Sequence, residues 1–244
     1  MRAAILALAL LFGTANTLPT LDAEMDALIE AGKLEAAFDL ASRAAEQGDP
    51  EAHDWLGWLH ETGEGVPVDP AKAAEHYRIA ARGADNHAAW RLGVMIDSGK
   101  AEGTLEEAVA LFRAAADRGY ATAMVSLAVM EATGRGTPQD FGAAMADYMR
   151  AAKLGDAGGV RGVAVMLYLG QGVAADPEEA AAWMLVAAAM GNKDADGNLG
   201  RMLEQLPNDH APAIGRRALA IADELGVKVS IVIQDDLPAD APAT

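Results

Sequence analysis

The chain contains no cysteine. This absence excludes disulfide bonds, thiolate metal sites, a cysteine nucleophile and a lipid-modified N-terminal cysteine. Aromatic residues are scarce too, at 5% of 244 residues, although 52% of the residues are hydrophobic. The core of such a chain must consist largely of Ala, Leu, Val and Met, a composition typical of alanine-rich helices that pack closely.

Basic residues are also few, with 19 Lys and Arg against 36 Asp and Glu and a formal net charge of −17. An acidic surface repels phosphate backbones and anionic lipid headgroups, which argues against a nucleic-acid-binding protein. We therefore expect no nucleic acid, and the negative charge is compatible with a partner of basic or apolar character.

Small residues, by contrast, are abundant, and they return at a spacing of 35 or 36 residues. The glycine that ends each unit recurs as Gly48, Gly83, Gly119, Gly155 and Gly191. An alanine ahead of it recurs as Ala37, Ala73, Ala108, Ala144 and Ala180, and an internal glycine as Gly63, Gly99, Gly134 and Gly170. A period in this range indicates a solenoid of supersecondary units.

Each unit reads as two helices joined by a glycine-bearing loop. Gly63 and Gly65 would end the first helix, because glycine accepts the left-handed conformation. Asp69 followed by Pro70 is then a strong start signal for the second helix. Within that helix an alanine is followed by an aromatic pair or its remnant and then by two alanines, all on one face.

These residues resemble the Sel-one-like repeat (SLR) family, relatives of the tetratricopeptide repeats with units of about 36 residues. In the first full copy the matching residues are Ala52, Leu56, Gly57, Gly63, Gly65, Asp69, Ala73, His76, Tyr77, Ala80 and Ala81. The resemblance covers about residues 50 to 200. It implies an all-α fold, a right-handed α-solenoid of helix-turn-helix repeats, and a role in protein recognition.

The chain then divides into five stretches. Residues 1–15 read as a signal peptide, with Arg2, an apolar run and small residues near Ala15; an uncleaved anchor or a buried first helix remains the alternative. We expect a capping helix pair over 16–49, four SLR-type repeats over 50–191, a degenerate C-terminal repeat or cap over 192–226, and an extended segment with a disordered tail over 227–244. After signal cleavage we expect no membrane span and a periplasmic or secreted protein.

Two C-terminal features allow alternative interpretations. Apolar residues alternate from Val227 to Ile233, which indicates an isolated strand that either covers apolar surface on the last helix or is offered to a partner or a second subunit. The stretch from Asn192 to Gly197 matches the opening half of a calcium loop, but position twelve is Leu203. Capping of a helix by Asn192 or Asp194 explains that stretch better.

A candidate binding surface follows from the first helix of each repeat. Counted from its leading small residue at 100° per residue, positions four, seven and eight form a packed stripe, and positions two, six and nine face the opposite side. Apolar residues dominate this second column, which the resemblance places on the concave surface. It is either an apolar groove for a partner or a part of the packing between repeats. The candidate partner-binding residues are Trp58, Trp90, Val94, Val125, Val129, Arg161, Val165 and Tyr168.

Catalytic patterns are missing. The histidines occupy different phases of the repeat, and no two have the i, i+4 spacing of a helical zinc pair. None of the four serines lies in a Gly-x-Ser-x-Gly turn. We therefore predict no enzyme, no cofactor and no metal. The resemblance to the SLR family and the signal peptide together imply a non-catalytic protein–protein interaction module (adaptor, scaffold or regulator) of the bacterial cell envelope. The alternative is an envelope hydrolase acting on peptidoglycan or a related substrate.

Overall fold

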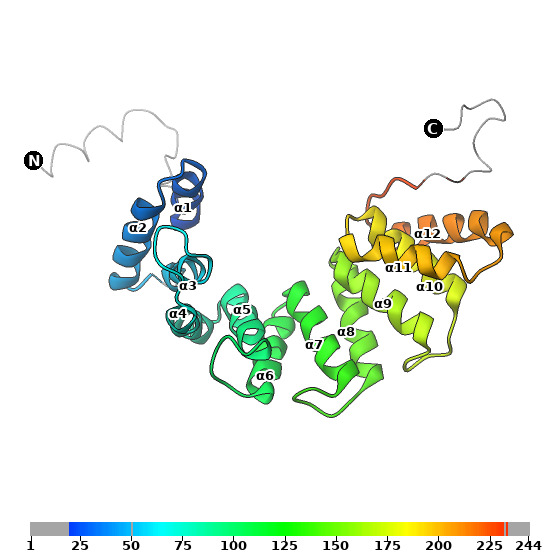
Figure 1. Cartoon of the computed structure of the whole chain (residues 1–244), viewed down its shortest axis with the longest axis horizontal. Helices are drawn as coiled ribbons and strands as arrows, with labels where there is room; N and C mark the ends of the chain where they lie inside the picture. The colour runs from blue at the N-terminus through cyan, green and yellow to red at the C-terminus, as the bar shows by residue number, and fades with distance from the viewer. Residues whose placement is uncertain (1–19, 50, 232, 234–244) are drawn as a thin grey trace, which may run out of the picture. The chain divides into compact units, whose positions relative to one another are not determined.

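The computed structural model describes residues 20–49, 51–231 and 233. Within them the chain is all-α, with no strand (Figure 1). The α-helices are α1 Leu21–Glu30, α2 Leu34–Glu46, α3 Ala52–Thr62, α4 Pro70–Arg82, α5 Asn86–Asp97, α6 Leu105–Asp117, α7 Ala121–Thr133, α8 Phe141–Lys153, α9 Ala157–Leu169, α10 Pro177–Ala189, α11 Lys193–Leu203 and α12 Ala211–Leu225. A 3₁₀ turn, Asn208–His210, precedes α12.

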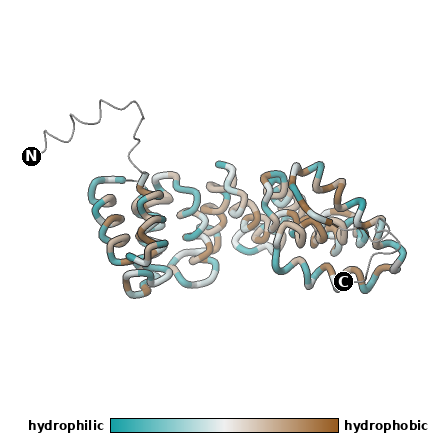
Figure 2. The backbone as a smooth tube through the Cα atoms, turned by 90° about the horizontal axis from the view of Figure 1, so that it is seen from above, coloured by the Kyte–Doolittle hydropathy of each residue, from teal (hydrophilic) through white to brown (hydrophobic). Residues whose placement is uncertain are grey.

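The chain forms two compact units, Met1–Gly83 and Ala84–Thr244. In the first unit, α1 packs on α2, α2 on α3 and α3 on α4. In the second, neighbouring helices from α5 to α10 pack in the same way, while α11 and α12 both pack on α10. Hydrophobic and hydrophilic residues alternate along these helices, as expected where each helix has a buried and an exposed face (Figure 2).

Aspartate and threonine side chains start the second helices, as predicted for Asp69. Asp69, Asp140 and Asp176 accept hydrogen bonds from the backbone N–H three residues on, at 3.1, 2.9 and 3.0 Å. Thr104 does the same for α6, at 3.2 Å. Each cap satisfies a backbone donor that the helix leaves unpaired, so the sequence signal and the helix boundary coincide.

The two glycines of the Gly-x-Gly loop have different tasks. Gly63 ends α3 with φ of +80°, a left-handed conformation that favours glycine. A Cβ on Gly65 would lie 2.5 Å from the carbonyl oxygen of Leu34 at the start of α2. The second glycine is therefore required by a close approach of the loop to the preceding second helix.

In one copy, the residue with positive φ at the end of the unit is not the glycine that the repeat spacing predicts. Gly48, Gly119, Gly155 and Gly191 all have positive φ, but Gly83 has φ of −78° and the next residue, Ala84, takes the left-handed conformation with φ of +68°. The position that requires positive φ is thus 84 in this unit. The sequence alignment on Gly83 was wrong by one residue there.

Aromatic rings of the second helices pack against glycines of the first helices. A Cβ on Gly57 would lie 2.6 Å from the ring of Tyr77, and a Cβ on Gly93 would lie 2.5 Å from the ring of Phe112. Both rings are fully buried. Each burial of this size stabilises the fold by roughly 2–3 kcal/mol, and it is possible only because the facing residue has no side chain.

The segment after α12 lies on the helices. Val227, Val229 and Ile231 are half-buried against the core of the second unit, Ile233 is buried, and Lys228 between them is exposed. A Cβ on Gly215 would lie 3.1 Å from the side chain of Ile233, so the segment crosses α12 at this glycine. The described residues of this segment form no strand, so that prediction was wrong; of its two interpretations, the structure shows the covering one.

Residues 1–15, read as a signal peptide, and the tail after Ile233 lie outside the described residues. None of the helices that the structure describes is long and apolar enough to cross a membrane.

Candidate functional site

The packed stripe of the first helices has the predicted orientation. Positions four and seven are buried in all four repeats, and position eight is buried in three of them, as His60, Ile96 and Glu131. The opposite column is half-buried, apart from Val129, which is 37% exposed. The predicted candidates therefore lie at the boundary between the core and the surface.

In the second unit, this column runs over α5, α7 and α9, which carry seven of the eight candidates. The indole N–H of Trp90 on α5 donates to the hydroxyl of Ser126 on α7, at 3.1 Å. Val125, Val165 and Tyr168 pack against the edge of the core. The hydrogen bond of Trp90 thus joins α5 to α7, and α7 is also in contact with α9.

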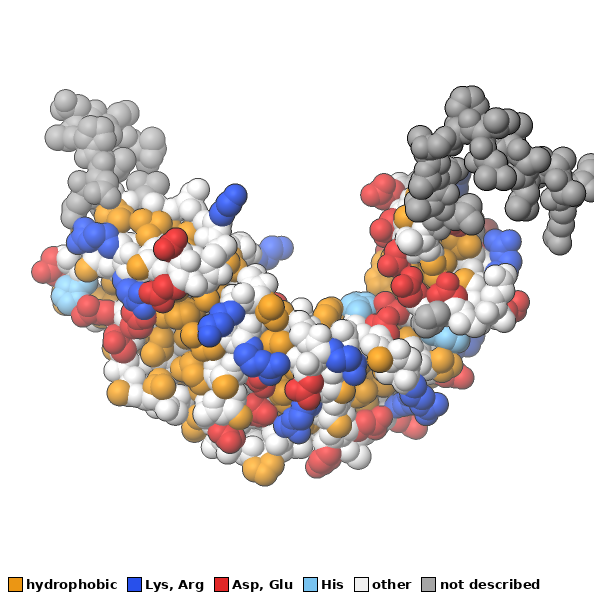
Figure 3. Space-filling model, turned by 180° about the vertical axis from the view of Figure 1, so that it is seen from behind, with side chains coloured by type: hydrophobic (Ala, Val, Ile, Leu, Met, Phe, Trp, Pro, Cys, Tyr) orange, Lys and Arg blue, Asp and Glu red, His pale blue; other side chains and the backbone are white. Residues whose placement is uncertain are grey.

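Polar atoms accompany the apolar ones in this first-helix column. The hydroxyl of Tyr168 donates to the side-chain oxygen of Gln205, at 2.7 Å, and Arg135 on the loop after α7 pairs with Asp97, at 2.6 Å. The Nε of Arg161 is buried without a hydrogen-bond partner in the structure. On the face shown in Figure 3, hydrophobic side chains reach the surface between acidic and basic ones.

The eighth candidate, Trp58, lies on α3 in the first unit. It packs against the core around Met25 and meets the ring of Trp55 edge-on, with centroids 5.9 Å apart. The indole N–H of Trp55 in turn donates to Asp22, at 2.7 Å. Trp58 is therefore tied to the packing of α1 and α3.

Three histidines that look scattered in the sequence lie together in the first unit. The Nδ1 atoms of His53 and His76 are 3.0 Å apart, so one of them donates to the other. The rings of His60 and His76 are parallel within 4°, with centroids 5.7 Å apart. Phe38 meets His60 edge-on from α2. The sequence analysis missed this histidine cluster.

The surroundings of the cluster favour neutral imidazoles. Burial is the main cause that lowers the pKa of His76, and charge on His53 or His60 lowers it further. Burial also lowers the pKa of His60, with a smaller contribution from Lys72. The Nδ1 of His60 is buried and has no hydrogen-bond partner in the structure. Protonation of the cluster would therefore place charge where water cannot solvate it.

A family model for the Sel1 repeat matches residues 32–49, 50–85, 86–120, 121–156 and 160–192. The chain belongs to the Sel1 repeat family. Proteins of this family generally mediate protein–protein interactions and serve as non-catalytic scaffolds. No curated protein matches the chain.

Solved Sel1 repeat structures are similar to this one. A Sel1 repeat protein from Oxalobacter formigenes is 26% identical, with a TM-score of 0.69, and 83% of this chain aligns with 80% of that one. The protective antigen c5321 of uropathogenic Escherichia coli strains, which displays an SLR fold, is 23% identical with a TM-score of 0.71. There, 81% of this chain aligns with only 45% of that chain. The immunity protein Pa5087 from Pseudomonas aeruginosa is 19% identical, with a TM-score of 0.53, and 91% of this chain aligns with 92% of that chain.

The Sel1 repeat phase explains why the histidines meet. His60 and His76 face each other between α3 and α4, and Glu131 and Asp147 occupy the same two positions in the third full repeat, where they also lie close to each other. Both carboxylates are paired with arginines: Arg113 with Glu131 at 3.2 Å, and Arg150 with Asp147 at 2.7 Å. Comparing these two columns in the sequence would have revealed both pairs.

Burial raises the pKa of Glu131, with the nearby Asp147 and Asp140 adding to it, while Arg113 acts in the opposite direction. One oxygen of Glu131 is buried without a hydrogen-bond partner in the structure. The Arg113–Glu131 pair joins α6 to α7, and Arg150 on α8 also donates to the backbone carbonyl of Ala116 on α6, at 3.1 Å. Among the described residues, no three His, Cys, Asp or Glu side chains are placed to hold a metal ion.

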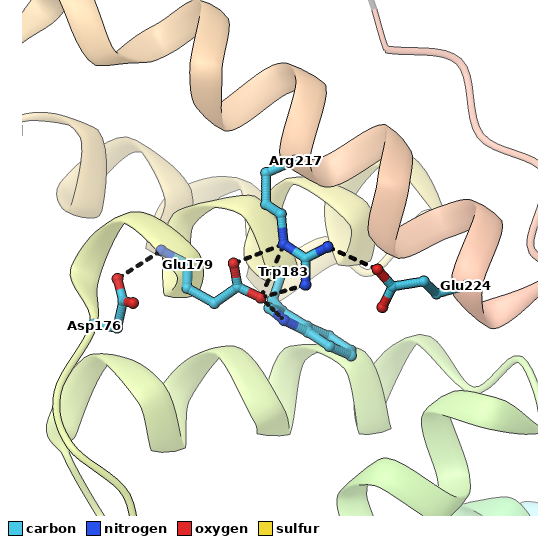
Figure 4. Close-up of polar contacts among 5 residues, drawn as sticks. All are labelled: Asp176, Glu179, Trp183, Arg217 and Glu224. Atoms are coloured by element: carbon cyan, nitrogen blue, oxygen red, sulfur yellow. Dashed lines mark hydrogen bonds and ion pairs between the residues drawn. The ribbon is translucent and has the colours of Figure 1, made fainter.

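A further polar cluster fastens α12 to α10 (Figure 4). The guanidinium of Arg217 donates to both carboxylate oxygens of Glu179, at 2.9 Å each, and to Glu224 at 2.8 Å. The indole N–H of Trp183 also donates to Glu179, at 2.9 Å. Arg217 is the main cause that lowers the pKa of Glu179. The last helix is thereby held on α10.

Proposed function

We propose that this Sel1 repeat protein is a non-catalytic binding module of the bacterial cell envelope, which holds a protein partner on the first-helix column of α5, α7 and α9. The observation that carries the proposal is the half-exposed row of apolar side chains on consecutive first helices. Trp and Tyr at its two ends are the residue types that most often anchor protein interfaces. The strongly acidic chain favours a partner with basic residues around an apolar contact.

No observation favours the alternative, an envelope hydrolase. The buried carboxylates Glu131 and Asp147, which a hydrolase would need as acid and base, are each paired with an arginine. Such pairing suits a structural role, because each carboxylate already has a charged partner within the fold.

Partner capture from a periplasmic extract tests the binding surface. The bait is residues 16–244, compared with a Val94→Glu, Val129→Glu double variant whose fold is checked by circular dichroism. We expect a captured protein to bind the purified bait and to lose at least about tenfold in affinity with the double variant. Ile79→Glu is the matched control, because Ile79 is 38% exposed on α4, outside the column. Equal loss with both variants would contradict the proposed surface.

The proposed location has a separate test. Mass analysis of the chain isolated from a bacterial host should give a mature protein that begins at Asn16 and lies in the periplasmic or secreted fraction. An intact Met1 in the cytoplasmic fraction would contradict the envelope location.

A further inference from the structure

The helix α11 is the first helix of the degenerate C-terminal repeat. Its residues match those of a first helix that a second helix covers, but no second helix of its own lies on it. Gly200 on α11 is at the repeat position of Gly57 and Gly93, and Leu203 is at the repeat position of His60 and Ile96. In the complete repeats these positions face the second helix of the same repeat. The ring of Tyr77 covers Gly57 and the ring of Phe112 covers Gly93, while His60 and Ile96 are 6% and 5% exposed.

On α11 the same face is open. A Cβ on Gly200 would meet nothing within 4 Å, and Leu203 is 37% exposed. The position on α12 that corresponds to the covering ring is Ala220, which is exposed. α11 is thus shaped to receive an aromatic side chain that its own second helix does not supply.

The reason is the direction of α12. This helix packs against α10, where Arg217 and Glu179 hold it, and it makes little contact with α11 although it follows α11 in the chain. The connection between α11 and α12 is a 3₁₀ turn, in place of the Gly-x-Gly loop that returns the second helix in complete repeats. α11 and α12 therefore diverge from their shared support on α10.

The divergence leaves a cavity of about 820 Å³. Its walls come from all three helices and from the extended segment, with Leu185 on α10, Leu199 and Leu203 on α11, Ile214 on α12 and Ile231 on the segment. Asp196 and Asp209 are its charged lining residues, and none of the lining residues is basic. The cavity combines apolar walls with negative charge.

We propose that this cavity is the seat of one amphipathic helix from a partner protein, placed on α11 as a second helix is placed in a complete repeat. The helix would present an aromatic side chain to Gly200, an aliphatic one to Leu203, and Lys or Arg to Asp196 and Asp209. This surface is separate from the first-helix column, so the inference goes beyond the proposed function.

Charge decides between the possible occupants. The chain after Ile233 carries Asp235, Asp236 and Asp240 and no basic residue, so it has the same sign as the cavity. A second copy of the chain has a net charge of −17, which opposes association in the same way. A helix with basic and aromatic side chains complements both the negative charge of the cavity and the uncovered face of α11 at Gly200.

The chain itself provides a probe of this chemistry. A fluorescent peptide with the sequence of residues 69–83 contains Tyr77, the ring that covers Gly57, and three basic against two acidic residues. We expect it to bind the full chain saturably in fluorescence anisotropy, with weaker binding at higher salt. The same peptide with Tyr77→Ala should bind at least about fivefold more weakly.

Variants of the full chain locate the binding. Leu203→Asp should weaken binding of the peptide at least about tenfold, whereas Leu219→Asp should change it less than about twofold. Leu219 is the matched control, because it is 38% exposed on α12 and does not line the cavity. Circular dichroism checks that both variants remain folded.

Three results would overturn the proposal. One is the absence of saturable binding up to millimolar peptide, and another is equal weakening by Leu203→Asp and Leu219→Asp. The third is a dimer in sedimentation velocity that Leu203→Asp dissolves, since the occupant would then be a second copy. The Val94→Glu, Val129→Glu variant should still bind the peptide, so failure of the first-helix column as a partner surface leaves this inference standing.

Discussion

At the scale of single residues, the repeat depends on where the backbone needs a glycine. Ala84 shows this most directly, because it takes a left-handed conformation that the equivalent positions of other repeats assign to glycine. For a residue with a Cβ, this conformation costs roughly 1–2 kcal/mol. The chain tolerates the strain at one copy of five.

Ala84→Gly should therefore stabilise the protein. Removal of the Cβ relieves the strain, while the greater freedom of glycine in the unfolded chain offsets part of the gain, so we expect an increase of up to about 1 kcal/mol. Urea unfolding followed by circular dichroism measures it. Ala110→Gly, at an exposed position inside α6, is the control and should instead lose about 1 kcal/mol. A loss at both positions would show that Ala84 is not strained.

Two glycines of one column test the close approach of the rings. Gly93→Ala should destabilise by about 1–3 kcal/mol, because the new methyl group would collide with the ring of Phe112. Gly200→Ala should stabilise by up to about 1 kcal/mol, because the same methyl group meets nothing on α11 and alanine favours the helix. Thermal unfolding of both variants compares them directly. If both substitutions changed the stability in the same direction, the covering ring of a second helix would not explain the need for glycine at position 93.

At the scale of helices, the face between the two helices of a repeat is where the copies differ most. Polar pairs occupy it in two copies, His60 with His76 and Glu131 with Asp147, while Ile96 stands there in another. Among these side chains, the two histidines have an ordinary pKa near neutral pH, so we expect the α3–α4 pair to respond to pH in this range.

The histidine cluster should make the α3–α4 pair sensitive to acid. The pKa values of His60 and His76 are lowered in the folded state, so the folded chain binds fewer protons than the unfolded chain below the ordinary value of 6.5. Stability is therefore full above pH 6.5 and falls as the pH drops below it. Asp69 and Glu75 oppose this loss and Lys72 adds to it.

Thermal unfolding at pH 7.5 and 5.5 measures the effect. The parent should melt at a lower temperature at pH 5.5, and a His60→Leu, His76→Leu double variant should lose most of that difference, since leucine fits a face that is Ile96 and Leu111 in the next repeat. His210→Leu, outside the cluster, is the control. An unchanged pH dependence in the double variant would assign the sensitivity to other groups.

The helices were predictable from the sequence because their signals are local. Asp69 and Asp176 cap where an Asp-Pro pair predicts it, and Gly63 ends α3 in the predicted conformation. The histidine cluster was not predictable from spacing along one helix, because His53 and His76 meet across two helices. Nor does any local signal give the direction of α12, which depends on the contact of Arg217 with a residue 38 positions earlier.

At the scale of the whole molecule, most contacts within each unit join helices that are neighbours in the chain, and the others, such as α7 with α9 and α10 with α12, join helices two apart. In a linear array of repeats, the free energy of unfolding is approximately a sum of contributions from single repeats and from the interfaces between them. A local defect therefore need not unfold distant repeats. The two compact units of this chain give that expectation a concrete test.

A buried charge in the first unit provides the defect. His60→Asp places a carboxylate in a site that is 6% exposed, against the ring of Phe38, so α3 and α4 should lose several kcal/mol of local stability, about 3 or more. In native-state hydrogen exchange, the amides of these helices should then exchange at least about a hundredfold faster. The amides of α9 and α10, three repeats further along the chain, should keep the parent rates within about twofold. Faster exchange in all helices would mean that the molecule unfolds as one cooperative body, so a partner bound at either end would stabilise every repeat. Unchanged rates in α9 and α10 would mean that a bound partner stabilises only the repeats near it.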